Sequence, residues 1–233
     1  MSHGDPAPLS WLQAAWLILR KDVAIELKTR ELTTSTGLFA VLVVVLTSLA
    51  FYLDRGTARA LAPGVLWVAI TFSGILAVSR AWAREREQDS FRGLLLSPLP
   101  RSAIYSGKVA ALCLFLTAVQ LVLVPLVALL FHTDLSGVLF PLLAILALGT
   151  LGFVATATLF GLLTVRTGAR DLLLSVVVFP LTAPVLLAAV VATRELISDA
   201  PMSEVYAWLR ILVAADIIFV AAGLALFEPL ALD

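Results

Sequence analysis

The sequence predicts an all-α integral membrane protein with six transmembrane helices, an N-terminal interfacial amphipathic helix and both termini in the cytoplasm. Of its 233 residues, 61% are hydrophobic and 14% are charged, whereas an ordinary soluble domain carries about 25% charged residues. Six long apolar runs contain only one of the 32 charged side chains. A soluble domain could not cover this much apolar surface, and a helix that crosses a membrane needs such a run of roughly 20 residues.

The composition excludes several other classes of protein. Sixteen basic and sixteen acidic residues give a net charge of zero, whereas a nucleic-acid-binding domain normally has a basic surplus. Cys113 is the only cysteine, which excludes a secreted domain held together by disulfides. The apolar runs do not alternate with polar residues as membrane β-strands do.

The chain is expected to form one transmembrane domain over residues 1–233. The expected spans are residues 37–53, 61–79, 109–131, 138–165, 172–193 and 211–227. The segments expected on the inside carry 12 Lys and Arg residues, and those expected outside carry 4. Because basic loops stay in the cytoplasm, both termini are expected there.

Residues 9–31 predict the interfacial helix, which lies against membrane lipid. Apolar side chains recur every three or four residues on one face: Leu12, Trp16, Leu19, Val23 and Leu27. The charged side chains fall mostly on the other faces, and Glu26 and Arg30 have the spacing of a favourable helical ion pair. An alternative is that this helix packs on a soluble partner subunit.

Residues 80–108 form the largest expected cytoplasmic loop. The first part is dense in charge, as inside loops commonly are. A segment that should be in water then carries the apolar side chains of Phe91, Leu94, Leu95 and Leu96, and Ser97-Pro98 ends the helix. A short apolar helix outside the membrane is typical of a segment that binds in a groove on a partner protein. Its leucines could instead fold back onto the chain's own interfacial helix.

Three residues within the spans are candidates for a pathway or gating role. Pro180 and Pro184 lie four residues apart in the fifth span, and broken helices line pathways in transporters, although ordinary membrane helices also tolerate proline. Asp216 is the charged residue inside the sixth span, and an intramembrane acid is a functional candidate by default. It could instead be a structural acid that pairs with Arg210. The outer segment 194–210 fits either a short helix or a hairpin.

The sequence contains no motif for catalysis or for direct cofactor binding. No phosphate-binding loop of the Gly-x-x-x-x-Gly-Lys-Ser/Thr type occurs. Two histidines are present, and His132, at the outer end of the third span, has no companion ligands for a metal or haem. We therefore expect a non-enzymatic chain without a metal, with any energy supplied by another subunit through the cytoplasmic loop.

Several stretches of the chain resemble the CcmB family, the permeases of the cytochrome c maturation system. The charged loop that closes in Leu-Leu-Leu-Ser-Pro, over residues 85–108, is similar to the coupling loop of export-type ABC permeases in general. Residues 61–69, Leu-Ala-Pro-Gly-Val-Leu-Trp-Val-Ala, and residues 179–187, Phe-Pro-Leu-Thr-Ala-Pro-Val-Leu-Leu, resemble this family in particular. Two residues depart from its pattern: Asp89 stands where glycine is usual and Arg92 where an acid is usual.

The resemblance implies a homodimeric permease that binds a separate ATPase of the CcmA type, which holds the ATP. It also implies association with CcmC-like and CcmD-like membrane proteins and with the haem chaperone CcmE. Haem would be exported, or ATP would drive the release of haem-loaded chaperone. The implied ATPase-coupling residues are Arg84, Glu85, Glu87, Asp89, Phe91, Leu94, Leu95, Ser97 and Pro98.

The sequence is also compatible with two alternative functions. The first is an export-type ABC permease for a lipid, a glycan or a drug. The second is a membrane scaffold that has no ATPase partner.

Overall fold

The computed structural model describes residues 9–50, 55–87, 93–94, 96–167 and 172–232, and these residues are helical apart from short turns. The long helices are α1 (Trp11–Thr29), α2 (Glu31–Ala50), α3 (Arg55–Glu87), α5 (Arg101–Leu130), α6 (Leu139–Thr167), α7 (Leu172–Ile197) and α8 (Met202–Leu232). Six of these, α2 to α8, are long and apolar enough to cross a membrane. The expected all-α architecture with six spans and an additional N-terminal helix is thereby confirmed.

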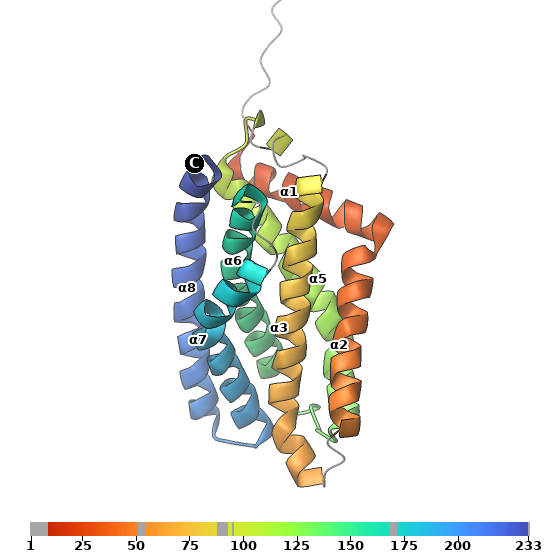
Figure 1. Cartoon of the computed structure of the whole chain (residues 1–233). Coiled ribbons are helices and arrows are strands. Elements are labelled where there is room, and N and C mark those ends of the chain that lie inside the picture. The colour runs from red at the N-terminus through yellow and green to blue at the C-terminus, as the bar shows by residue number, and fades with distance from the viewer. Residues whose placement is uncertain (1–8, 51–54, 88–92, 95, 168–171, 233) are drawn as a thin grey trace, which may run out of the picture.

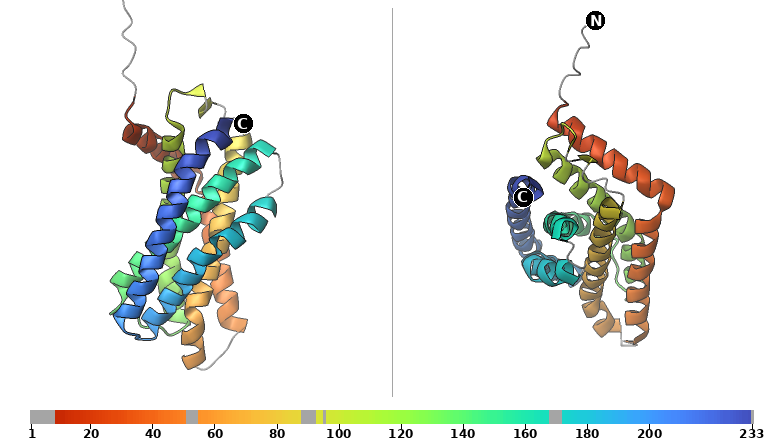
Figure 2. Two further views of the ribbon diagram at one scale, coloured as in Figure 1. Left: turned by 90° about the vertical axis from the view of Figure 1, so that its left-hand side faces the viewer. Right: turned by 45° about the horizontal axis from the view of Figure 1, so that its top comes forward.

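The six long helices stand side by side as a bundle, and α1 lies across one end of it (Figure 1). Figure 2 shows the same end from two further directions, with α1 running from the start of α5 to the top of α2. The last turns of α3, the first turns of α5 and the end of α8 all lie at this end (Figure 1). A helix that crosses a bundle end in this way agrees with an interfacial position for α1.

The helices extend beyond the apolar runs that predicted them. α3 continues to Glu87, so the first residues of the expected cytoplasmic loop are helical. α8 begins at Met202, nine residues before the expected span. The outer segment 194–210 forms neither a separate short helix nor a separate hairpin, because α7 runs to Ile197, a turn follows, and α8 begins directly after Pro201. Proline before a first helical turn costs no hydrogen bond.

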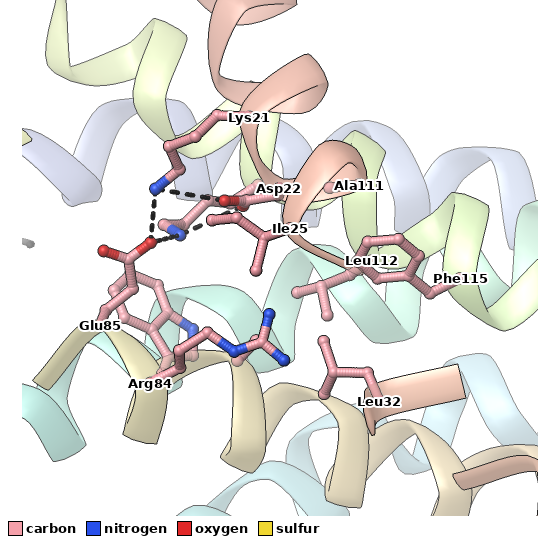
Figure 3. Close-up of a pocket in the computed structure, with 12 residues that line it drawn as sticks. Lys21, Asp22, Ile25, Leu32, Arg84, Glu85, Ala111, Leu112 and Phe115 are labelled. Atoms are coloured by element: carbon pink, nitrogen blue, oxygen red, sulfur yellow. Dashed lines mark hydrogen bonds and ion pairs between the residues drawn. The ribbon is translucent and has the colours of Figure 1, made fainter. Parts of the chain in front are cut away.

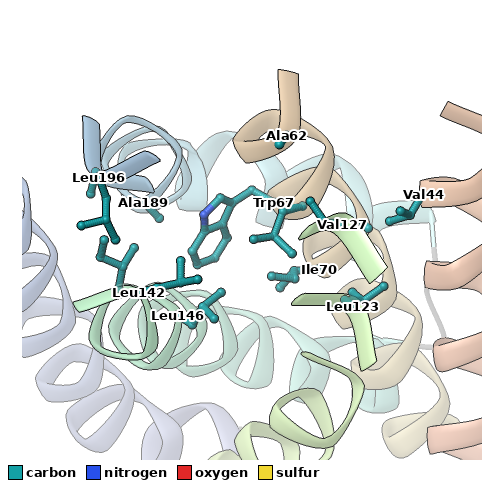
Figure 4. Close-up of a cluster of buried hydrophobic side chains, with 14 of the residues drawn as sticks. Val44, Ala62, Trp67, Ile70, Leu123, Val127, Leu142, Leu146, Ala189 and Leu196 are labelled. Carbon is teal, nitrogen blue, oxygen red and sulfur yellow. The ribbon is translucent and has the colours of Figure 1, made fainter. Parts of the chain in front are cut away.

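Small residues on α6 receive large side chains from α3. A Cβ on Gly149 would overlap the ring of Trp67, and a Cβ on Gly161 would overlap Trp82. Trp67 is 1% exposed, and its indole N–H donates to Thr193 Oγ1 at 2.9 Å. Figure 4 shows Trp67 surrounded by apolar side chains from several helices. The glycines thus permit close helix contact, as small residues do in membrane bundles.

Candidate functional site

The candidate site lies where α1 crosses α3 and α5. Gly107 brings α5 against α1, because a Cβ there would overlap Ile18 and the Ala15 carbonyl. Nearby, the indole N–H of Trp11 donates to Ser102 Oγ at 3.0 Å. These contacts hold α1 at the point where α3 leaves the bundle and α5 returns to it, so that charged residues of all three helices meet.

Glu85 of α3 is the centre of a buried ion cluster (Figure 3). Its Oε1 accepts hydrogen bonds from Lys108 Nζ of α5 at 2.7 Å and from Lys21 Nζ of α1 at 2.8 Å. Asp22 completes the cluster, at 3.3 Å from Lys108 Nζ and 3.2 Å from Lys21 Nζ. The side chains of Lys108 and Glu85 are 5% and 7% exposed. Two cations and two carboxylates thus join three helices with no net charge.

Lys108 is buried, and several groups compensate its ammonium. A buried ammonium costs several kcal/mol unless its charge is paired and its protons are bonded. Besides the two carboxylates, its Nζ lies 5.3 Å from the ring centroid of Trp82, where the negative face of an indole attracts a cation. Removal of one partner should therefore destabilise the junction of the three helices.

A second group of ion pairs connects the corner between α1 and α2 to α3. Glu26, which is 4% exposed, lies 3.5 Å from Arg84 Nη2, and its Oε1 accepts the Thr33 backbone N–H at 2.8 Å. Glu31, at the start of α2, lies 3.3 Å from Arg80 and 3.7 Å from Arg84. The last turns of α3 thus form ion pairs with both α1 and α2 where these two helices meet.

The expected ion pair between Glu26 and Arg30 is wrong. Arg30 ends α1 in the left-handed conformation, with φ of 52°, and its backbone N–H donates to the Glu26 carbonyl. This turn carries the Arg30 side chain out of the helical register that the spacing assumed. Glu26 instead points toward α3, where Arg84 compensates its charge.

The pKa of Lys21 is raised above its ordinary value of 10.5. Burial acts to lower this pKa, but the nearby charge of Asp22 and the hydrogen bond and charge of Glu85 outweigh it. Lys21 is therefore protonated at neutral pH and remains a donor to both carboxylates.

A cavity of about 260 Å³ borders the ion cluster. Its wall combines the charged side chains with the apolar side chains of Trp82, Leu112 and Phe115, as Figure 3 shows for the labelled residues. This volume corresponds to several water molecules at about 30 Å³ each. The cluster therefore has free space on one side.

The implied coupling residues take different positions. Arg84 and Glu85 point into the bundle and are paired within the chain. Leu94 is half-buried and packs against the apolar cluster that contains Ile18 of α1. Glu87 ends α3, but its side chain lies outside the described residues, as do Asp89, Phe91 and Leu95. These assignments to ATPase coupling therefore remain predictions.

The segment before α5 is held by short-range hydrogen bonds and leaves one leucine outside. Ser97 Oγ donates to the Leu94 carbonyl at 2.5 Å, and Arg101 Nη1 donates to the carbonyls of Leu94 and Ser97 at 3.5 and 3.4 Å. Pro98 is exposed. Leu96 is 88% exposed, so it faces outward, whereas Leu94 and Leu99 fold back onto the chain.

Asp216 lies in the middle of α8 rather than near its outer end, because the helix begins at Met202. At 1.5 Å per residue, Asp216 is about 21 Å from Met202. It is 5% exposed, it faces Gly152 of α6, and neither carboxylate oxygen has a hydrogen-bond partner among the described residues. The expected alternative, an ion pair with Arg210, is absent from the described contacts.

The structure does not bring Asp216 together with the two prolines. Pro180 and Pro184 lie on the exposed face of α7, and α7 remains a helix through both residues. A different α7 residue, the buried Val185, points toward Gly152 beside Asp216. A pathway or gating role for these three residues remains a prediction.

Sequence reasoning missed Lys21, Asp22, Glu26 and Lys108 as members of the site. Lys108 borders a long apolar run, and a lysine in that position is normally assigned to the membrane surface. The available signal was on α1, where Asp22 and Glu26 are four residues apart and share a face. Within the part of the chain that the structure describes, no three His, Cys, Asp or Glu side chains are grouped as metal ligands.

Comparisons with known proteins agree with this architecture. The family model described as CcmB protein matches residues 13–231. A protein named heme exporter protein B from Pseudomonas aeruginosa is 29% identical over 216 residues, which cover 89% of this chain and 94% of that one. Its namesake from Bradyrhizobium diazoefficiens is 28% identical, with 80% and 83% covered, and that from Haemophilus influenzae is 31% identical, with 74% and 77% covered.

Proposed function

Because this chain belongs to the CcmB family of haem exporter permeases, we propose that a separate ATPase subunit drives it through the segment 80–108. The chain is a multi-span membrane protein and the permease subunit of an ABC system of the cytochrome c maturation type. The ATPase would be CcmA-like and would hold the ATP, while this chain binds no cofactor of its own.

The observation that carries the proposal is the ion cluster around Glu85. This residue lies two residues before the end of α3 at Glu87, and its carboxylate holds Lys21 of α1 and Lys108 of α5. A displacement of the loop by a partner would therefore move α1 and α5 with it, because separating buried opposite charges is costly. We assign Arg84 and Glu85 to transmission of motion rather than to direct contact with the ATPase.

Direct contact with the ATPase falls to the exposed part of the same loop. Leu96 offers a large apolar side chain, 88% exposed, on a segment whose backbone is fixed by Ser97 and Arg101. An apolar anchor on a rigid segment, inserted into a groove, is a common source of binding energy between proteins.

The other partners follow from the family. We propose a homodimer of this chain with two ATPase subunits, in contact with CcmC-like and CcmD-like proteins and with a CcmE-like haem chaperone. Haem is then exported, or haem-loaded chaperone is released by the ATP-driven motion. We place the complex in the bacterial inner membrane with α1, the loop and both termini in the cytoplasm, which the Lys and Arg count supports. The alternative of a lipid, glycan or drug exporter has no support among the relatives.

Copurification tests the assignment of the docking segment. The wild-type chain, purified from its native host in mild detergent, should retain an ATP-hydrolysing subunit. Leu96→Glu should lose that subunit while the chain remains folded, and Leu96→Met, which keeps an apolar side chain, should retain it. Full retention by Leu96→Glu would contradict the docking segment. Normal c-type cytochromes in cells that lack this chain would contradict the function.

A further inference from the structure

The charges of α1 are sorted between its two sides. Both acids of the helix, Asp22 and Glu26, are directed into the ion pairs with α3 and α5. Three of its basic residues, Arg20, Lys28 and the terminal Arg30, are exposed. The sequence of α1 mixes both signs, but the folded helix therefore exposes only positive charge to its surroundings.

Large apolar side chains are exposed on the same helix. Leu12 is 73% exposed, Trp16 62% and Leu27 72%. A helix that presents apolar and basic side chains together is typical of a membrane surface with anionic lipid. The soluble-partner alternative for α1 does not explain why its two acids are withdrawn and its bases remain outside.

A groove of about 480 Å³ runs between α1, α2 and α5. Its floor is mainly apolar, and it ends at the corner where Arg30, Thr33 and Thr34 lie. Along α5 the lining extends from Leu114 to Leu121, about 10 Å of helix. The apolar wall consists of Val23, Leu27, Leu114, Phe115, Ala118 and Leu121.

The one acid in the wall of this groove does not oppose an anion. Glu26 lies 3.5 Å from Arg84, and its Oε1 accepts the Thr33 backbone N–H. Its charge is thus compensated from the protein side. The guanidinium of Arg30 has no ion pair among the described contacts, and it remains available at the end of the groove.

We propose that this groove holds one anionic glycerophospholipid, with an acyl chain along α5 and the headgroup phosphate at Arg30. The apolar wall fits a hydrocarbon chain, and the exposed cations of α1 select a negative headgroup over a zwitterionic one. The bound lipid fills the gap between α1 and α5 on the side opposite the ion cluster. This site does not depend on the ATPase partner.

Native mass spectrometry of the full chain in mild detergent tests the proposal, with phosphatidylglycerol and phosphatidylcholine added in equal amounts. The wild-type chain should retain one phosphatidylglycerol in preference to phosphatidylcholine. Arg30→Gln should reduce this preference roughly fivefold, the value expected for loss of one basic contact at about 1 kcal/mol. Arg86→Gln removes an exposed cation from α3, outside the groove, and should leave the preference unchanged.

A second variant tests the chain-binding part of the groove. Ala118 is exposed and lines the groove, so Ala118→Trp should fill it and abolish retention of both lipids, while Ala118→Ser should retain them. Equal retention of the two lipids by the wild type, or lipid retained by Ala118→Trp, would overturn the proposal. A protein chain retained at the groove in place of lipid would overturn it as well.

Discussion

Lys108 in the first turns of α5 donates a hydrogen bond of 2.7 Å to Glu85 near the end of α3, and both side chains are almost fully buried. The pair joins the end of α3 to the first turns of α5, the two helices that the coupling segment connects, and Lys21 and Asp22 extend it to α1. The proposed coupling between an ATPase and the bundle depends on this connection.

Lys108→Met is expected to destabilise the chain. Loss of one partner of a buried ion pair typically costs about 3–5 kcal/mol, because the other charge is left without compensation. Here Lys21 still compensates Glu85, so we expect about 2–3 kcal/mol, measured as a lower unfolding temperature in detergent. Lys28→Met, at an exposed position of α1, is the control. An unchanged unfolding temperature for Lys108→Met would mean that the pair does not stabilise the junction.

The stabilisation that Lys21 provides should depend on pH in the alkaline range. Its pKa in the folded chain is raised above the ordinary 10.5, so its contribution is fully present below pH 10.5 and is lost as the pH rises through the folded-state pKa. Unfolding temperatures between pH 9 and 12 should fall more steeply for the wild type than for Lys21→Arg, because arginine stays charged in this range. Parallel curves would show that Lys21 does not gain stability from its two carboxylates.

Gly149→Ala should destabilise the bundle, although alanine is the better helix former. The added methyl group would overlap Trp67, and this ring cannot move freely because its N–H is bonded to Thr193. Overpacking of this kind costs about 1–3 kcal/mol. Gly64→Ala in α3 is the matched control, since no atom lies within 4 Å of its Cβ position, and it should be neutral or stabilising by up to about 1 kcal/mol. Equal effects on the unfolding temperature would refute the packing argument.

Asp216→Asn separates a structural role from a functional one. The carboxylate is buried and has no hydrogen-bond partner among the described residues, so its removal should not lower stability by more than about 1 kcal/mol. If Asp216 takes part in the transport cycle, accumulation of c-type cytochromes should fall although the protein level is unchanged. Normal accumulation together with normal stability would exclude that role.

The architecture was predictable because apolar runs of membrane length are a property of local sequence. The ends of the helices were harder to predict than their existence, because helices continue into polar segments. This is why α8 begins nine residues before its expected start, and why Asp216 is in mid-helix rather than near the outer surface.

The site was only partly predictable, because its members come from three separate helices. The family resemblance of the charged loop implied Arg84 and Glu85, but the sequence did not show that they point inward. Asp22 and Lys108 lie 86 residues apart in the sequence, and no local pattern connects them. The left-handed turn at Arg30 was equally hidden, and it changes the partner of Glu26.

The central claim is that Glu85 transmits motion from the loop to α1 and α5, and Glu85→Gln tests it most directly. The measurement is the amount of mature c-type cytochrome formed per ATP hydrolysed by the assembled complex, at matched protein levels. We expect the variant to retain the ATPase subunit and to hydrolyse ATP, but to form severalfold less cytochrome per ATP than the wild type. An unchanged ratio would contradict a transmitting role for Glu85. Loss of the ATPase subunit would contradict it as well, because it would indicate that Glu85 binds the ATPase directly.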